Sequence, residues 1–266
     1  MLSTCQFFSS VLATNVTINV VVPTPEGEEQ IIEENFVQNY PYQSGFPVIY
    51  LLHGAYGNCH SWVRFSSIER YAQKHRCVLV MASAENSFYH NEVYGNRYYD
   101  FFADELPQMV GNVFPISTER SKTFVAGFSM GGYGAWLLAL KHPERFAKAA
   151  SLSGALDLAY LHESPQYGVD DGPIPWHRLF KDPQNLRRSN SDLIKLYDDL
   201  QASGRAIPAL YQSIGLDDPL YELNLKVKEQ LTQRQAQLLF YSEPGGHNWE
   251  FWDQDIQRVL QWMLPS

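Results

Sequence analysis

Gly127-Phe128-Ser129-Met130-Gly131 follows the apolar run Lys122–Ala126 and precedes a helical pattern that starts near Met130. The pattern G-x-S-x-G between a strand and a helix is typical of a sharp turn that raises a serine above the carboxyl edge of a parallel sheet. Glycine on either side leaves room for the strained backbone of such a turn. The following helix points free N–H groups at any negative charge that develops beside the serine. The segment therefore predicts an α/β fold with Ser129 as a nucleophile.

Short apolar runs alternate with helical patterns from about residue 47 onward, which favours a parallel sheet whose strands are covered on both faces. Before them, Val16–Val22 and Ile31–Val37 indicate an antiparallel hairpin that turns around Pro23, Pro25 and Gly27. We predict one α/β-hydrolase domain over residues 1–266, with an approximately eight-stranded, mostly parallel sheet flanked by helices. The other expected strands are Val48–Leu52, Cys77–Met81, Thr123–Ala126, Ala147–Leu152, Pro208–Ile214 and Gln237–Tyr241.

Helical periodicity fills most of the gaps between these strands. The stretch from Ala155 to Asn190 has no sustained period and is rich in Pro, Gly, Ser and Asp. A connection that long inside a compact domain is usually a lid or a binding loop, so we expect an insertion over residues 155–190 to cover the site. A surface excursion without a role is the alternative. The expected helices are Trp62–His75, Asp100–Val113, Met130–Lys141, Asp192–Ser203, Leu223–Arg234 and Glu250–Met263.

The composition and the apolar segments of the chain limit which partners and which cellular compartment we expect. The net charge of −9 disfavours nucleic acid, because binding phosphates needs a concentrated basic patch. No segment approaches the roughly 18 apolar residues of a membrane span, and the N-terminus lacks the pattern of a secretory signal. The cysteines, three in number, fit reduced thiols and have no metal-type spacing. We therefore expect a cytoplasmic protein without a metal, a cofactor or a membrane partner.

A serine nucleophile needs a base and an acid, which in this fold follow it in the order Asp or Glu, then His, on loops after later strands. His247 lies between the last predicted strand and the last helix, and we predict it to be the general base. The turn after the penultimate strand holds Asp217 and Asp218. The residues alone leave the choice between them open, because either carboxylate could instead accept backbone N–H groups in the turn.

Two backbone amides should form the oxyanion hole, that of Met130 after the nucleophile and that of Ala55 in the segment Leu51–Gly57. A less favoured alternative is a catalytic thiol at Cys59, which adjoins His60. Aromatic rings near these motifs could line an acyl or sugar pocket, although core packing is the ordinary role of such rings. The candidates are Tyr56, Trp62, Tyr98, Trp176 and Trp249.

Together, five segments resemble the esterase D-type α/β-hydrolases, and within them the bacterial tributyrin esterases. The resemblance implies the acid as well, because Asp218 falls on the aspartate of the family's G-x-x-D-x-L-Y-E pattern, which leaves Asp217 as runner-up. Phe128 stands where relatives often have Leu, and we expect its ring to point into the core. The segments are Leu51–Gly57, Gly127–Gly134, Ser153–Ala155, Gly215–Glu222 and Gly245–Trp252.

The resemblance implies a serine carboxylesterase that acts through an acyl-enzyme on short-chain acyl esters, acetyl to butyryl, or on acetylated or feruloylated sugars. A thioesterase of the S-formylglutathione hydrolase kind would share the triad and differ in its leaving group. A catalytically silent binding protein of the same fold is the third hypothesis. The family also contains oligomers, so a homo-oligomer is compatible with the sequence.

Overall fold

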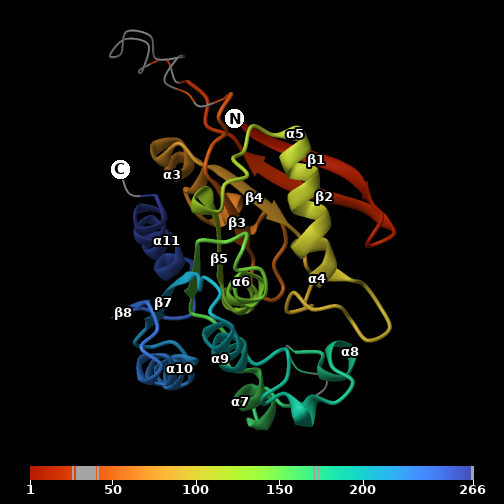
Figure 1. Ribbon diagram of the computed structural model, residues 1–266, viewed down its shortest axis with the longest axis vertical. Helices are drawn as coiled ribbons and strands as arrows, with labels where there is room; N and C mark the ends of the chain where they lie inside the picture. Colours follow the sequence, from red (N-terminus) through yellow and green to blue (C-terminus); the bar gives the residue numbers. More distant parts are fainter. Residues whose placement is uncertain (26, 28–39, 41, 170–171, 173, 265–266) are drawn as a thin grey trace.

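In the computed structural model, residues 1–25, 27, 40, 42–169, 172 and 174–264 are described. Within them, eight strands form one central sheet in the order β1-β2-β4-β3-β5-β6-β7-β8 (Figure 1). The strands from β3 to β8 pair in parallel, whereas β2 runs antiparallel to both β1 and β4. This arrangement confirms the predicted α/β-hydrolase fold. The strands are β1 (Leu2–Ser9), β2 (Thr14–Val21), β3 (Val48–Leu52), β4 (Val78–Ala82), β5 (Thr123–Phe128), β6 (Lys148–Leu152), β7 (Ala209–Gly215) and β8 (Leu238–Glu243).

The N-terminal hairpin differs from its prediction in one strand. From Ile18 to Val21, β2 pairs with β1 on one side and with β4 on the other, so the hairpin partner is β1. The strand expected at Ile31–Val37 lies outside the described residues. β1 escaped prediction because its side chains alternate between exposed and half-buried, which leaves no continuous apolar run.

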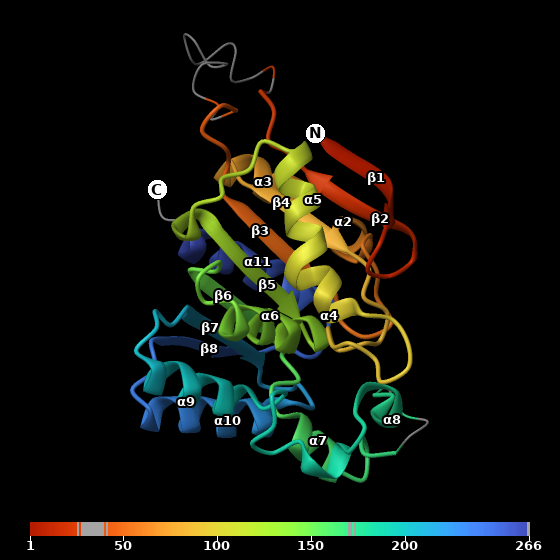
Figure 2. The same ribbon diagram turned by 45° about the vertical axis from the view of Figure 1, so that its right-hand side comes forward.

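Helices cover both faces of the sheet (Figures 1 and 2). Along β3, Tyr50 packs with the core under α5, α6, α9 and α10, whereas Ile49 and Leu51 pack with the core under α2, α3 and α11. Period-two alternation of apolar side chains therefore supplies both cores from a single strand. The helices are α2 (Ser61–Phe65), α3 (Ile68–His75), α4 (Tyr98–Asp100), α5 (Leu106–Val113), α6 (Met130–Lys141), α7 (Leu158–Glu163), α8 (Trp176–Leu179), α9 (Leu193–Ser203), α10 (Tyr221–Gln233) and α11 (Trp249–Met263).

The single helix expected at Trp62–His75 is two helices, α2 and α3. The Ser66 hydroxyl donates to the Trp62 carbonyl at 2.5 Å, and the Ser67 N–H donates to Asp253 of α11 at 2.9 Å. Serine side chains compete with the helical hydrogen-bond pattern in this way, and the chain bends between the two helices. A π-helical turn at Phe101–Glu105 likewise separates α4 from α5 within the expected Asp100–Val113.

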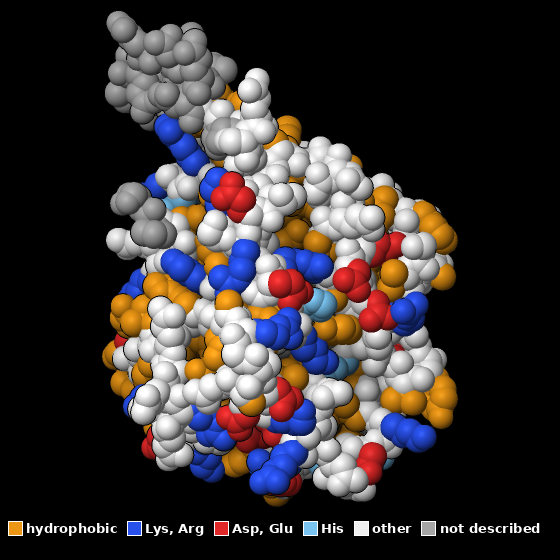
Figure 3. Space-filling view, viewed as in Figure 1, with side chains coloured by type: hydrophobic (Ala, Val, Ile, Leu, Met, Phe, Trp, Pro, Cys, Tyr) orange, Lys and Arg blue, Asp and Glu red, His pale blue; other side chains and the backbone are white. Residues whose placement is uncertain are grey.

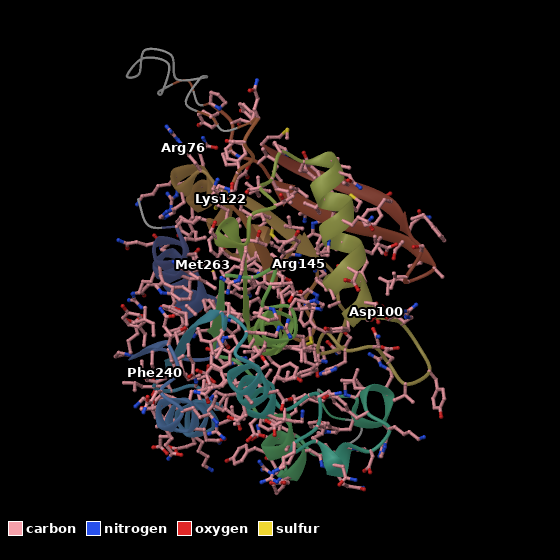
Figure 4. The ribbon with its side chains drawn as sticks, in the orientation of Figure 1. Arg76, Asp100, Lys122, Arg145, Phe240 and Met263 are labelled. Atoms are coloured by element: carbon pink, nitrogen blue, oxygen red, sulfur yellow. The ribbon has the colours of Figure 1, made fainter. Side chains whose placement is uncertain are left out.

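Two labelled side chains in Figure 4 mark the two layers: Phe240 of β8 packs against the core under α10, and Met263 at the end of α11 lies in the opposite core. Basic and acidic side chains are interspersed on the face shown in Figure 3. Among the described residues, no helix combines the length and the apolar character needed to cross a bilayer.

The insertion at residues 155–190 holds α7 and α8, which lie together at one end of the molecule (Figure 2). It is tied to the loop after β4, because the Arg178 guanidinium pairs with Glu92 at 3.0 Å and the Val93 N–H donates to the Arg178 carbonyl at 2.8 Å. The Arg187 guanidinium pairs within the insertion with Glu163 at 2.9 Å. The insertion is therefore anchored to the domain by polar contacts as well as by its buried side chains.

Two histidines are held neutral inside the fold. Burial lowers the pKa of His53 to about 4. Burial, together with the charge of Lys141, lowers the pKa of His90 to about 3. Since an unfolded histidine binds a proton near pH 6.5, the unfolded chain holds more protons than the folded one between pH 6.5 and about 4. The free energy of unfolding therefore falls as the pH falls through this window.

We expect His90→Gln to flatten this dependence, because it removes one titrating group from the unfolded chain. The slope of the unfolding free energy against pH should decrease by up to about 1.4 kcal/mol per pH unit below pH 6.5. Urea titrations of the wild type and the variant at a series of pH values between about 4.5 and 6.5 measure this slope. An unchanged slope would mean that His90 is protonated in the folded protein.

Candidate active site

Ser129 occupies a strained turn between β5 and α6, with φ of 54° and ψ of −120°. Such a conformation costs about 1–3 kcal/mol and persists only where the surroundings enforce it. Its N–H donates to the Leu152 carbonyl of β6 at 2.9 Å, and its carbonyl accepts from the Gly132 N–H at 3.0 Å. A Cβ at Gly127 would collide with the carbonyl of Gly131. The two motif glycines therefore permit the close approach that exposes Ser129.

The loops after β7 and β8 bring an acid and a histidine to the same sheet edge. The Asp217 N–H donates to the Gly245 carbonyl at 2.9 Å, which joins the two loops. A Cβ at Gly215 would collide with that same carbonyl, so the contact requires glycine. Asn248 caps α11 by accepting from the Phe251 N–H at 3.1 Å, and this cap leaves His247 as the loop residue just before it.

A continuous hydrogen-bond chain links the three predicted side chains. The Ser129 hydroxyl lies 3.0 Å from Nε2 of His247, and Nδ1 of His247 lies 2.9 Å from Oδ2 of Asp218. A carboxylate only accepts, so Nδ1 carries the proton and Nε2 is free to accept from Ser129. This tautomer is the one that a general base next to a serine requires.

Asp218, and not Asp217, faces the histidine. The Asp218 side chain is fully buried, and its second oxygen accepts from the Leu220 N–H at 2.8 Å. Both carboxylate oxygens are thus occupied, which fixes the orientation of the group. Asp217 is exposed, and its contribution is the backbone bond between the two loops.

The two amides predicted for an oxyanion hole lie at the loops next to Ser129. Ala55 follows the carboxyl end of β3, and Met130 is the first residue of α6. Within the described part of the chain, neither N–H donates to a protein acceptor. A Cβ at Gly54 would lie 3.2 Å from the Ser129 Cβ, so this loop passes directly beside Ser129. Two free donors therefore flank the serine, as an oxyanion requires.

A cavity of about 380 Å³ opens above Ser129. The insertion contributes four residues to its wall: Ala155, Leu161, Tyr167 and Ile174. The residue types around it are mostly apolar and aromatic, and among the described residues no Lys, Arg, Asp or Glu lines it. The other lining residues are Gly54, Ala55, Tyr56, Gly57, Ser61, Phe65, Phe88, Phe128, Pro219, Leu220, His247, Trp249 and Trp252.

The structure separates the five aromatic pocket candidates. Tyr56 and Trp249 line the cavity. Trp62, Tyr98 and Trp176 are buried in the core instead, which corrects the expectation for these three. The indole N–H of Trp62 donates to the Leu52 carbonyl at 3.0 Å, and that of Trp176 to the Tyr167 carbonyl at 2.7 Å. A Trp whose N–H finds a backbone acceptor is a stable core residue.

The ring of Phe128 lies in the core, as expected, and it also faces the cavity. Its ring is buried, stacks on Trp252 at 4.2 Å and meets Trp249 edge-on at 4.7 Å, yet it forms part of the cavity wall as well. Sequence reasoning missed the insertion residues Leu161 and Ile174, which belong to a stretch without periodicity. Trp252 could have been predicted to line the cavity, because it lies one helical turn after the pocket candidate Trp249 and therefore on the same face of the helix.

Cys59 does not form a second site. It is buried, and burial raises the pKa of its thiol, which opposes a thiolate nucleophile. The neighbouring His60 turns Nδ1 toward the Asn19 side-chain amide at 2.8 Å. In the described part of the chain, His, Cys, Asp and Glu do not gather in threes as they would to hold a metal ion.

Comparisons with known proteins agree with this geometry. The profile of a protein family described as esterase matches residues 30–263. An acetyl esterase of Caldicellulosiruptor saccharolyticus is 30% identical over 260 residues, which are 97% of this chain and 96% of that protein.

Solved structures are similar over their full length. The fluorophosphonate-binding serine hydrolase F of Staphylococcus aureus has a TM-score of 0.84 at 28% identity, covering 100% of this chain and 99% of that one. The S-formylglutathione hydrolase of the same organism has a TM-score of 0.83 at 28% identity, covering 99% of each chain. A ferulic acid esterase at 22% identity has a TM-score of 0.78, covers 99% of this chain and 97% of that one, and shares the fold.

The adjacent aspartates offer a matched pair of variants. We expect Asp218→Asn to slow the labelling of Ser129 by a fluorophosphonate by roughly 10⁴-fold, because an amide at this position favours the wrong histidine tautomer. Asp217→Asn should stay within about twofold of wild type, because its backbone bond to Gly245 survives. Labelling rates of the two purified variants provide the measurement. Equal losses in both would remove the distinction between the two carboxylates.

Proposed function

Because this chain belongs to the esterase family of α/β-hydrolases, and is thus a carboxylic ester hydrolase, we propose that it cleaves short-chain acyl esters, acetyl to butyryl, through an acyl-enzyme on Ser129. The observation that carries the proposal is the chain from Ser129 through His247 to Asp218 at the floor of a cavity whose described lining holds no Lys, Arg, Asp or Glu. The acetyl esterase relative, similar over nearly its whole length, supports the same substrate class.

The geometry supports a two-step acyl transfer. His247 takes the hydroxyl proton as Ser129 attacks the ester carbonyl, and the amides of Ala55 and Met130 donate to the oxyanion. His247 then gives the proton to the departing alkoxide, which leaves as the alcohol. Water, deprotonated by the same histidine, attacks the acyl-serine. The bond from the acyl carbon to the Ser129 oxygen then breaks, His247 returns the proton to that oxygen, and the acid leaves. Asp218 keeps Nδ1 protonated and stabilises the imidazolium in both steps.

The size and lining of the cavity favour small acyl groups. Its volume of about 380 Å³ lies at the low end for ligand pockets. Leu161, Ile174 and Leu220 present apolar surface, on which each buried methylene of an acyl chain gains about 0.8 kcal/mol. An acetyl to butyryl chain can use this surface without a polar partner.

Charge separates an oxygen ester from a glutathione thioester as the substrate. Glutathione carries carboxylates and an ammonium group, and binding them needs charged or hydrogen-bonding partners. The described wall of the cavity has no ionic side chain, and its exposed rim residue Tyr56 presents a flat ring. Such a ring suits an uncharged alcohol, including a sugar or an aromatic alcohol. We therefore favour an oxygen ester over a glutathione thioester as the substrate.

The nucleophile is tested with Ser129→Ala. We expect p-nitrophenyl acetate and butyrate hydrolysis to fall by at least about 10⁴-fold, because no other hydroxyl adjoins His247 in the described site. Fluorophosphonate labelling should disappear together with turnover. Ser121→Ala, at an exposed position, is the control and should match wild type. A folded wild type that neither turns over nor is labelled would favour the silent binding protein.

The leaving group is tested by comparing p-nitrophenyl acetate with S-formylglutathione on the wild type. We expect kcat/KM to be at least about tenfold higher for the uncharged ester, because the described residues of the wall include no Lys, Arg, Asp or Glu to pair with the charges of glutathione. Steady-state kinetics at matched pH and ionic strength give the ratio. A ratio in favour of S-formylglutathione would assign the chain to the thioesterases.

A further inference from the structure

His53 lies between β3 and the oxyanion loop, and both of its ring nitrogens are engaged. His53 is 1% exposed. The Ala84 N–H lies 2.8 Å from Nε2, and the Gly54 carbonyl oxygen lies 2.7 Å from Nδ1. A backbone N–H can only donate, so Nε2 is the acceptor and the single ring proton is on Nδ1. Nδ1–H therefore donates to the Gly54 carbonyl, and the tautomer follows from the contacts alone.

The Gly54 carbonyl belongs to the same peptide unit as the Ala55 N–H. A trans peptide is planar, and its C=O and N–H point in opposite directions. Holding the Gly54 oxygen therefore also sets the direction of the Ala55 N–H. The Gly57 N–H donates to the same oxygen at 3.1 Å. A Cβ at Gly57 would lie 3.0 Å from both Nδ1 of His53 and the Gly54 oxygen, so a side chain there would crowd this arrangement.

The loop after β4 forms hydrogen bonds with His53 and with the oxyanion loop. In addition to the bond from Ala84, the Tyr89 hydroxyl donates to the His53 carbonyl at 2.9 Å, and Oδ1 of Asn86 accepts from the Tyr56 N–H at 2.8 Å. Phe88 and Tyr89 have positive φ angles of 50° and 58°, a conformation that non-glycine residues adopt only when their surroundings enforce it. Strain of this kind is characteristic of structure that holds a site in place.

We propose that His53 is a positioning residue for the oxyanion hole, because its Nδ1–H holds the Gly54–Ala55 peptide with the Ala55 N–H aimed at the developing oxyanion. The inference rests on the proposed esterase function. It concerns a residue that touches neither substrate nor Ser129 in the described contacts. His53 should affect the transition state, in which negative charge appears on the carbonyl oxygen of the substrate. Its loss should therefore lower kcat more than it weakens ground-state binding.

The protonation state of the ring supports this role. Burial lowers the pKa of His53 to about 4, against an opposing effect of the Gly54 carbonyl. The imidazole therefore stays neutral where the enzyme would work, and Nε2 remains available to the Ala84 N–H. A protonated ring would have two donors and would leave that buried N–H without its acceptor.

Two substitutions separate the two nitrogens of His53. Asn places an amide N–H where Nδ1 lies and loses the acceptor for Ala84, whereas Gln reaches the Nε2 position and loses the donor to Gly54. We expect His53→Asn to keep kcat for p-nitrophenyl acetate within about fivefold of wild type. His53→Gln should lose kcat by roughly 10- to 100-fold with little change in KM, since one oxyanion donor is worth 10²–10³ in rate when removed.

A second readout reports on the oxyanion hole alone. The inhibition constant of a trifluoromethyl ketone, which forms a tetrahedral oxyanion on the serine, should rise in His53→Gln in proportion to the loss of kcat. Thermal unfolding of both variants checks that they are folded. If His53→Gln does not fold, His53→Leu replaces it, because leucine has the shape of asparagine without its donor.

The outcomes are distinct. A kcat loss confined to the variants without the Nδ1 donor supports the proposal. Equal kcat losses in His53→Asn and His53→Gln that parallel their losses of thermal stability would mean that His53 has only a structural role. That result would overturn the proposal. An inactive wild type would instead contradict the proposed function, and the wild-type assay with its Ser129 label is run first for that reason.

Discussion

The close approach of three backbone segments around Ser129 is the constraint on which the rest of the structure depends. The strained turn after β5 is pressed between the end of β3 and the end of β6. A Cβ at Gly131 would lie 2.6 Å from the carbonyl oxygens of both Leu52 and His53, and the Ser129 N–H is bonded to Leu152. The turn can therefore exist only where its two neighbouring strands are already in register. Local strain and global topology thus support each other.

The order of strands then decides which loops meet. Parallel strands end at one edge, so the loops after β3, β5, β7 and β8 converge there. In this order they contribute the Ala55 amide, the Ser129 hydroxyl, the Asp218 carboxylate and the His247 imidazole. The bond from Asp217 to Gly245 holds the last two loops together, and the burial of Asp218 fixes the direction of its carboxylate. Sheet order and loop contacts together give the geometry that a serine esterase needs.

Which aromatic residues line the cavity could not be predicted from their positions in the sequence. Tyr56, Trp62, Tyr98, Trp176 and Trp249 all adjoin motifs or the insertion, and only Tyr56 and Trp249 line the cavity. Nothing in the sequence separates the two groups, because the division depends on which partner each ring meets after folding. Leu52 provides the acceptor for Trp62, from a strand ten residues away. The helix break at Ser66 similarly depends on Asp253, a partner remote in sequence.

The sequence by itself determined the α/β fold, the sharp turn at Ser129 and the chain order of serine, aspartate and histidine, because apolar periodicity and the glycines of a strained turn are local signals. Asp218 was separated from Asp217 by resemblance to a family, and the contact with His247 follows only from the folded loops. Tertiary structure alone decided that β1 completes the hairpin, which residues of the insertion line the cavity, and that the His53 ring contacts the Gly54 carbonyl. These features depend on contacts between segments far apart in the chain, and such contacts leave no pattern within either segment.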